Sequence, residues 1–246
     1  MARGYTKQVR RKVASVGSRG REWIVTRSPL WLKRALRPVA LHADLFLTDH
    51  GIFRSLYLNH HRLDEHAFRS AQPSPRQIRK MSQSGVKTII NLRGARSCGS
   101  YTLERAACER HGVELIDFRM RSRAGPSPDD LRRVAELFQQ IQYPVLFHCK
   151  SGADRAGIMS VLYLFLHRGV PIETALNQLS LKYGHIRQAE TGVLDHFFES
   201  FIAARDATGV DFWTWLERDY DPNRLKAEFQ SNKFADRVVN SVLRRE

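Results

Sequence analysis

Cysteine is scarce in this chain of 246 residues, and the few cysteines lie far apart. There are three, Cys98, Cys108 and Cys149, and no two of them form a C-x-x-C pair. An odd number at wide spacing argues against a disulfide framework and for a reducing compartment. The pattern fits one cysteine that does chemistry and two that act as small apolar side chains.

Long apolar segments are also missing. A secretory signal needs an uninterrupted apolar stretch of about 7–15 residues, and a membrane span needs about 20. The apolar runs near the N-terminus, such as Trp23–Val25 and Leu30–Leu32, are short and are interrupted by basic residues. We therefore interpret the chain as a cytoplasmic protein.

Acidic residues are few, because 25 Asp and Glu stand against 40 Lys and Arg, a formal charge of +15. Residues 1–38 hold eleven basic residues and one acid, so +10 of this charge lies there and +5 in the rest. Such an arm attracts phosphate-rich partners. An anionic membrane surface, and with it a peripheral membrane location, is the favoured partner; nucleic acid is a less favoured one. An organellar transit peptide is an alternative interpretation of the same Arg-rich arm.

The chain beyond the arm predicts alternating strands and helices. Strands are expected at residues 67–70, 86–92, 113–118 and 144–148, whereas residues 39–66 are irregular. Helices are expected at residues 74–84, 101–111, 128–142, 155–168, 171–183, 189–205, 211–220 and 223–244. This alternation predicts an α/β fold with a central, mostly parallel sheet of about four to five strands flanked by helices.

The same pattern suggests three parts of the chain. Residues 1–38 form a basic, partly disordered arm, in which Ser28-Pro29 opens a short amphipathic helix. Residues 39–206 form the α/β domain, and residues 207–246 form a C-terminal helical extension.

The junction at residues 148–155, where a buried strand meets an apolar helix, has the most unusual composition. It begins with His148-Cys149 and ends with Arg155, with Gly152 between them. A helix N-terminus attracts anions, and a tight loop can turn successive N–H groups toward phosphate oxygens. Arg155 can add a planar, permanently charged clamp. The same field favours the thiolate of Cys149, which then acts as an in-line nucleophile beneath a bound phosphorus.

Cys-x5-Arg, preceded by His148 and containing Gly152, resembles the fingerprint of the cysteine-based protein tyrosine phosphatases. Residues 68–73 (FRSAQP) and 86–93 (VKTIINLR) make the chain similar to the compact, dual-specificity-like branch common in bacteria. The resemblance covers about residues 66–186. It implies phosphomonoester hydrolysis through a phosphocysteine, without a metal or organic cofactor. The residues it implies for the site are the catalytic Cys149 and Arg155, and the phosphate-binding Lys150, Ser151, Gly152 and Ala153.

The implied substrate is a phosphorylated protein, with phosphotyrosine as the first choice, or a small phosphoester. The basic arm and the loop residues Arg121 and Arg123 equally suit phosphoinositides or phosphorylated glycans and lipids at a membrane. A protein of another class, a non-catalytic phosphate-binding adaptor, is also consistent with the sequence. Binding of nucleic acid through the arm is a third hypothesis, which predicts salt-sensitive affinity.

Two features depart from the family pattern. Most members carry Ser or Thr directly after the arginine, where its hydroxyl assists breakdown of the phosphocysteine, but this chain has Ala156. Ser151 takes part of that role, or the second step is slow.

The second departure concerns the general acid, because the loop at residues 119–126 contains no acidic residue. Asp154, inside the phosphate loop, is the first candidate by resemblance to Lys-Asp-Arg and Ala-Asp-Arg loops of some relatives. Asp117, within the strand predicted at residues 113–118, is a second, and it points either toward the site or away from it. Asp129 and Asp130 are a third, although Ser127 and Pro128 before them indicate a capped helix start.

Several other polar side chains have two interpretations. Arg93 either contacts substrate or is a surface arginine. His148 is expected to bond local backbone and orient the loop, and His185 either lines the pocket or packs at a helix end. His60, His61, His66 and Asp64 lack the spacing of metal ligands, so no metal site is expected.

Overall fold

The computed structural model describes residues 58–231 of the chain. The basic arm, its expected helix and the end of the last expected helix lie outside the described residues. The proposed division of the chain at residues 38 and 206 stays a prediction.

A five-stranded sheet forms the centre of the described residues, with the order β1-β2-β5-β3-β4. All neighbouring strands are parallel except β1, which runs antiparallel to β2. The predicted mostly parallel sheet of an α/β fold is confirmed. The strands are β1 (His61–Arg62), β2 (Ala67–Ala71), β3 (Thr88–Asn91), β4 (Glu114–Asp117) and β5 (Val145–Cys149).

Strand β1 lies in a segment that was expected to be irregular, and this expectation was wrong. The strand has only two residues, His61 and Arg62, which pair with Arg69 and Phe68 of β2. So short an edge strand has no alternating pattern that a sequence could show, and its pairing depends on the adjacent β2.

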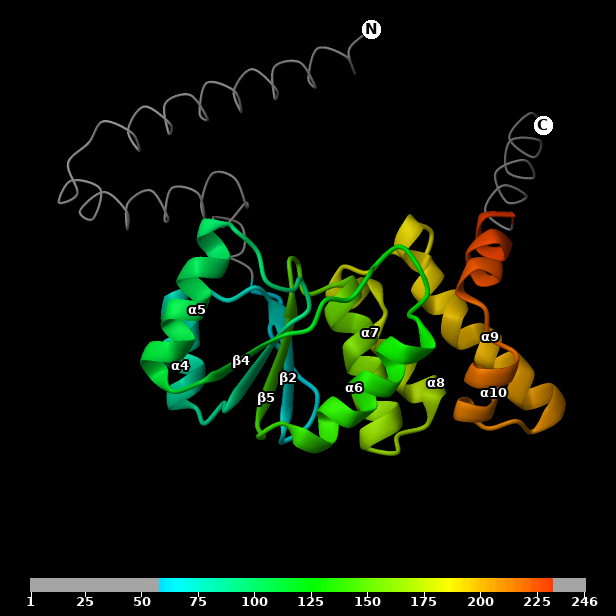
Figure 1. The fold of residues 1–246 in the computed structure, drawn as a ribbon, viewed down its shortest axis with the longest axis horizontal. Coiled ribbons are helices and arrows are strands. Elements are labelled where there is room, and N and C mark those ends of the chain that lie inside the picture. Colours follow the sequence, from blue (N-terminus) through cyan, green and yellow to red (C-terminus); the bar gives the residue numbers. More distant parts are fainter. Residues whose placement is uncertain (1–57, 232–246) are drawn as a thin grey trace, which may run out of the picture.

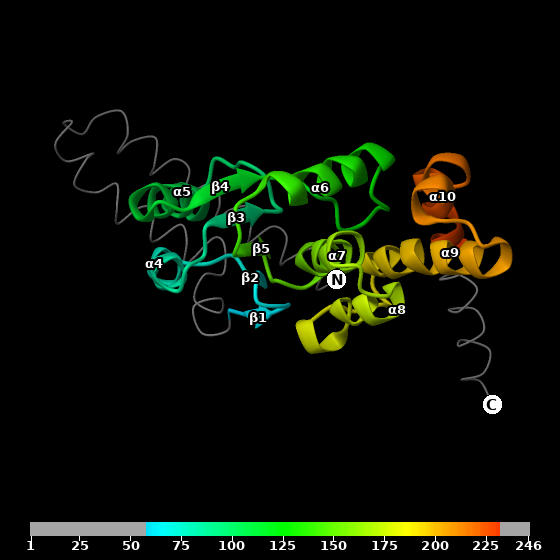
Figure 2. The same ribbon diagram turned by 90° about the horizontal axis from the view of Figure 1, so that it is seen from below.

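The helices cover both faces of the sheet, as Figures 1 and 2 show. Helices α4 and α5 lie on one side, and α6, α7 and α8 lie on the other, with α9 and α10 farther from the sheet. The α-helices are α4 (Pro75–Gln83), α5 (Gly99–His111), α6 (Pro128–Gln140), α7 (Asp154–Leu162), α8 (Ile172–Ala175), α9 (Val193–Thr208) and α10 (Phe212–Arg218). Residues 222–231 are also helical.

Two apolar clusters hold these layers together. The smaller one lies between the sheet and α4 and α5, and includes Ile78, Ile89 and Leu146. The larger one joins the sheet to α6 and α7 and continues through the buried aromatic side chains of α9 and α10. The buried aromatic side chains of this C-terminal part are Phe197, Phe198, Phe201, Phe212 and Trp215, whereas Trp213 is only partly buried.

The helix predicted at residues 171–183 was wrong beyond its first turn. Helix α8 ends at Ala175, and two short 3-10 turns follow, η2 (Leu176–Gln178) and η3 (Leu181–Tyr183). The backbone carbonyls of Gln178 and Tyr183 accept hydrogen bonds from the side chains of Arg69 and Asn59. A distant part of the fold therefore uses the carbonyls that a longer helix would have used, and periodicity alone does not reveal this.

Candidate active site

The predicted phosphate loop connects β5 to α7 at the carboxyl ends of the parallel strands. Cys149 is the last residue of β5 and is 2% exposed, and Asp154 is the first residue of α7. Ala71, at the end of the neighbouring strand β2, pairs with Cys149. The structure thus brings the cysteine, the loop and a helix N-terminus together as the sequence predicted.

Gly152 has a conformation and a position that only glycine suits. Its φ angle is +76°, and a Cβ atom there would lie 2.7 Å from the backbone nitrogen of Ala71. The loop therefore presses directly on the end of β2. A side chain at this position would meet backbone, which cannot move aside as the tip of a flexible side chain can.

Three consecutive carbonyl groups of the loop are bound from outside it. The Nδ2 atom of Asn59 donates to the Ser151 oxygen at 3.0 Å. The Nη2 atom of Arg69 donates to the oxygens of Gly152 and Ala153, at 2.7 and 3.0 Å. Because N–H and C=O point in opposite directions across a trans peptide, the N–H groups that follow these carbonyls face the other way. Successive N–H groups turned to one side make a concave anion site.

Arg69 is fully buried beneath this loop, where it also binds the segment after α8. Its Nη1 atom donates to both the backbone oxygen and Oε1 of Gln178, at 2.6 and 2.9 Å. Its guanidinium lies 4.1 Å from the ring centre of Tyr183. Burial lowers the pKa of Arg69 to about 10, against the opposing effects of Tyr183, Cys149 and Asp154, so the side chain is charged at neutral pH.

The other residues predicted to bind phosphate lie in the loop and on the first turn of α7. Arg155 is half-buried on the first turn of α7 and has no ion-pair partner within residues 58–231. Lys150 is half-buried and Ser151 is exposed. Ala156 is fully buried, and its backbone oxygen accepts from the Ser160 hydroxyl at 2.6 Å.

Asp154 is linked to a buried histidine and, through it, to a second carboxylate. His185 Nδ1 lies 2.8 Å from Asp154 Oδ1, and His185 Nε2 lies 2.7 Å from Asp195 Oδ2. Burial by itself would lower the pKa of His185, but the hydrogen bonds to Asp154 and Asp195 outweigh it and raise the pKa to about 9. The sequence left two interpretations of His185, packing at a helix end or lining the pocket. The structure supports neither in simple form, because the buried His185 ring contacts Asp154, the candidate general acid.

His148 was expected to bond local backbone, but its main partner is a carboxylate. Its Nδ1 lies 3.5 Å from the Cys149 oxygen, whereas its Nε2 lies 2.8 Å from Glu104 Oε1. His148 and Glu104 are both fully buried. The Glu104 carboxylate also accepts from Gln72 Nε2 at 2.7 Å, and Gln72 accepts from Arg93 Nη1. Arg93 is therefore a buried member of a polar network, and the surface interpretation of this residue was wrong.

The remaining candidate acids have other partners. Asp117 accepts from Asn91 Nδ2 at 2.7 Å and from the Tyr101 hydroxyl, which occupies both of its oxygens. Bonding to Asp117, together with burial, raises the pKa of Tyr101 to about 12.

Asp129 and Asp130 lie in the first turn of α6, as the capped helix start indicated. Ser127 Oγ accepts from the Asp130 backbone N–H at 3.1 Å, which makes Ser127 the N-cap. The two carboxylates pair with Arg132 and Arg133 of the same helix. Their contacts are those of a helix terminus.

Sequence reasoning missed four residues that support the loop: Asn59, Arg69, Glu104 and Asp195. Arg69 lies in the segment at residues 68–73 that resembles the phosphatase family, but the sequence of a short strand does not indicate that a charged residue in it is fully buried. Glu104 and Asp195 do carry a weak signal, because each is an acidic residue directly beside a leucine within a helix. Their partners lie far away in the chain, so no local spacing identifies them.

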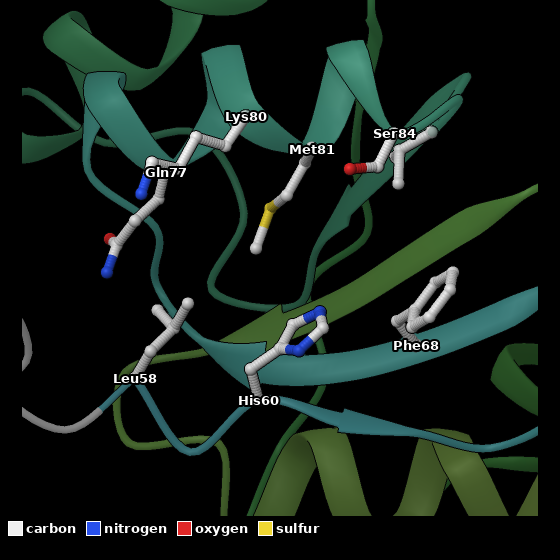
Figure 3. Close-up of a pocket in the computed structure, with 8 residues that line it drawn as sticks. Leu58, His60, Phe68, Gln77, Lys80, Met81 and Ser84 are labelled. Carbon is white, nitrogen blue, oxygen red and sulfur yellow. The ribbon is translucent and has the colours of Figure 1, made fainter.

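An apolar pocket lies between β2 and α4 (Figure 3). It has a volume of about 370 Å³, and Leu58, Phe68, Lys80 and Met81 are among its lining residues. None of the predicted site residues lines it. Phe68 and Arg69 are consecutive in β2 and so point to opposite faces of the sheet. Within residues 58–231 there is no group of three or more His, Cys, Asp or Glu side chains that could hold a metal ion.

Comparisons with known proteins agree with the family that the motif predicted. The chain belongs to the family described as DSP-PTPase phosphatase fused to NAD+ kinase, which matches residues 55–193, more than half of the chain. The resemblance to dual-specificity-like cysteine phosphatases is confirmed. None of the curated proteins matches the chain.

Several solved structures are similar to this chain. TpbA of P. aeruginosa has 19% identity and a TM-score of 0.49, over 62% of this chain and 92% of that chain. A cysteine-to-serine variant of TpbA in complex with pTyr has 18% identity and a TM-score of 0.46, over 59% of this chain and 91% of that chain. A putative phosphatase of Neisseria meningitidis has 24% identity and a TM-score of 0.44, over 55% of this chain and 96% of that chain.

Every helix within residues 58–231 is too short or too polar to span a bilayer.

Proposed function

We propose that this chain hydrolyses phosphate monoesters in two steps through a phosphocysteine on Cys149. The observation that carries the proposal is the bonding of the loop carbonyls of Ser151, Gly152 and Ala153 by Asn59 and Arg69. These bonds keep the loop amides turned toward an anion at the N-terminus of α7. Membership of a phosphatase family supports the same chemistry.

In the first step the Cys149 thiolate attacks phosphorus, so that a P–S bond forms and the bond to the leaving oxygen breaks. Asp154 gives its proton to the leaving oxygen. The loop amides and Arg155 stabilise the equatorial oxygens, with Lys150 at the rim. In the second step water attacks phosphorus and gives a proton to Asp154, and the P–S electrons return to sulfur. The buried network that contains Arg93 holds the adjacent strand end.

Phosphotyrosine or mixed phosphoprotein substrates are the first choice, because the family is described as dual-specificity and tyrosine phosphatases. One observation favours a second class, a phosphoester at an anionic membrane surface. Leu181 and Ile186 are the exposed large apolar residues of the described part, at 76% and 50%. Between them Tyr183 binds Asn59, which also binds the phosphate loop. The basic arm would assist such binding.

An assay of the purified 246-residue chain with an activated aryl phosphate tests the proposal. We expect turnover that needs no added metal, and Cys149→Ser should abolish it while the folded variant still binds inorganic phosphate. Turnover no higher than that of Cys149→Ser, with phosphate binding intact, would instead identify a phosphate-binding adaptor. Loss of both properties in the wild-type chain would remove both hypotheses.

A panel of phosphotyrosyl peptides, phosphoseryl peptides, sugar phosphates and phosphoinositides in vesicles separates the substrate classes. A Leu181→Ser, Ile186→Ser double variant serves as the matched control for membrane substrates. We expect it to lose activity on vesicles only if the second class is correct. Equal activity on soluble peptides in both proteins shows that the catalytic loop is intact.

A further inference from the structure

His185 is a buried titratable side chain that the phosphoryl-transfer steps themselves do not use. It is 2% exposed and lies between η3 and η4, in a segment that packs against α7. Its two ring nitrogens lie 2.8 and 2.7 Å from carboxylates on two different helices, Asp154 on α7 and Asp195 on α9. These two carboxylates are the titratable groups that raise its pKa to about 9, against the lowering effect of burial.

This charge state decides the hydrogen bonding. At neutral pH the ring is an imidazolium, so both nitrogens are donors and each carboxylate receives one N–H. A neutral ring has only one N–H and would leave one of the two carboxylates facing a lone pair. The pair of bonds therefore holds the Asp154 carboxylate in one orientation only while His185 carries its proton.

We propose that His185 and Asp195 are positioning residues for Asp154, fixing its Oδ1 atom and balancing its charge so that Oδ2 exchanges the catalytic proton. The inference rests on the proposed function, because it concerns the acid of that reaction. Asp195 binds the Nε2 side of the His185 ring, and the Nδ1 side of the ring binds Asp154, which is the first residue of α7 and precedes Arg155.

The proton balance is simple. Asp154 first takes a proton from solvent on Oδ2. In the first step Oδ2–H gives that proton to the leaving oxygen, and the restored carboxylate charge faces the imidazolium. In the second step the attacking water returns a proton to Oδ2, while its oxygen bonds to phosphorus and the P–S bond breaks. His185 keeps both protons throughout, so no further donor or acceptor is needed.

If His185 and Asp195 had only a structural role, their variants would slow the hydrolysis of esters with good and poor leaving groups to the same extent. An acid matters for a poor leaving group, whose oxygen must be protonated, and matters little for an activated aryl leaving group. Misfolding or a damaged phosphate loop would slow both substrates equally. The ratio of the two rates therefore reports on Asp154 and its support.

The test compares wild type, Asp154→Asn, His185→Gln and Asp195→Asn, with His196→Gln as the matched control. His196 is a histidine of the same helix α9 whose carboxylate neighbour, Glu228, is 3.9 Å away. Each protein is assayed on an activated aryl phosphate and on an alkyl phosphate. We expect His185→Gln and Asp195→Asn to lower kcat on the alkyl ester about 10- to 100-fold, with KM within about 2-fold. On the aryl ester kcat should fall less than about 3-fold, and His196→Gln should match wild type on both.

An NMR titration of the His185 ring supplies a second, activity-independent measurement. We expect the ring to titrate near pH 9 in wild type and at lower pH in the nearly isosteric Asp195→Asn. Equal losses on both esters, no loss on the alkyl ester, or a His185 ring that titrates near 6.5 would overturn the inference. If wild type hydrolyses neither ester, the proposed function itself fails, whereas these outcomes in an active enzyme reject only the positioning role.

Discussion

Arg69 Nη2 donates a hydrogen bond of 2.7 Å to the carbonyl oxygen of Gly152, so a buried arginine of β2 holds the back of the phosphate loop. The same guanidinium reaches Ala153 and the backbone of Gln178. One side chain thereby connects the loop to the segment that carries His185. The shape of the proposed anion site therefore depends on a residue that need not touch the anion.

Replacing Arg69 by Lys should damage the loop without changing the charge. An ammonium group cannot reproduce the planar fork that reaches three carbonyls at once. Hydrogen bonds to charged groups contribute roughly 1.5–3 kcal/mol each, so we expect a loss of about 3 kcal/mol in unfolding free energy. We also expect at least about 10-fold weaker phosphate binding.

Urea unfolding and titration with inorganic phosphate measure these two effects. Arg62→Lys is the control, because Arg62 is exposed on neighbouring β1 and bonds only locally, to the Asp64 oxygen. An Arg69→Lys protein that binds phosphate as tightly as Arg62→Lys would show that the arginine does not shape the site.

Gly152→Ala should abolish activity and destabilise the fold. An alanine there would adopt a left-handed φ angle and bring Cβ to 2.7 Å from the Ala71 nitrogen. Gly112 separates these two effects, because its φ is +63° but a Cβ there meets nothing within 4 Å. Gly112→Ala should cost only the conformational penalty, about 1–2 kcal/mol, and retain activity. Equal thermal shifts for the two variants would contradict the close contact of the loop with β2.

The stability of the fold should decrease as pH rises from about 6.5 to about 9. Unfolded His185 releases its proton near 6.5, whereas the folded residue keeps it until about 9. His185 therefore stabilises the fold fully at pH values below its unfolded pKa, and this stabilisation is lost as the pH rises through its folded pKa. The loss in unfolding free energy is on the order of 3 kcal/mol. Urea unfolding of wild type and Asp195→Asn over this range measures the effect. We expect the difference between the two proteins to shrink toward pH 9, and a difference independent of pH would refute the assignment.

Ala156→Ser should speed breakdown of the phosphocysteine. The hydroxyl would restore the group that most family members place after the arginine, where it helps the thiolate to leave. We expect a larger steady-state rate with the initial burst of aryl leaving group unchanged, and rapid-mixing kinetics distinguish the two. Ala156 is fully buried, so Ala156→Gly controls for packing changes. A slower steady state in Ala156→Ser than in Ala156→Gly would speak against this role.

The sequence by itself determined the parts of the protein that depend on local pattern. The buried strands of parallel sheets are continuous apolar runs, so β3 and β5 were predictable within a residue or two. The edge strand β4 has no buried residue, and it was predictable from the alternation of strands and helices along the chain. The helix ends at Gly85 and Gly112 and the cap at Ser127 follow from the chemistry of those residues. Cys149, Gly152 and Arg155 are recognisable because one short loop carries them all.

Tertiary structure decided what supports that loop. Arg69 and Asn59 bind its carbonyls, Glu104 contacts His148, and Asp195 holds His185, and each pairing joins segments distant in the chain. The early end of α8 has the same origin, because Arg69 takes the Gln178 carbonyl. Local pattern encodes which groups a segment presents, but a buried charge acquires its partner only when the layers pack together, since desolvation makes an unpaired charge too costly there.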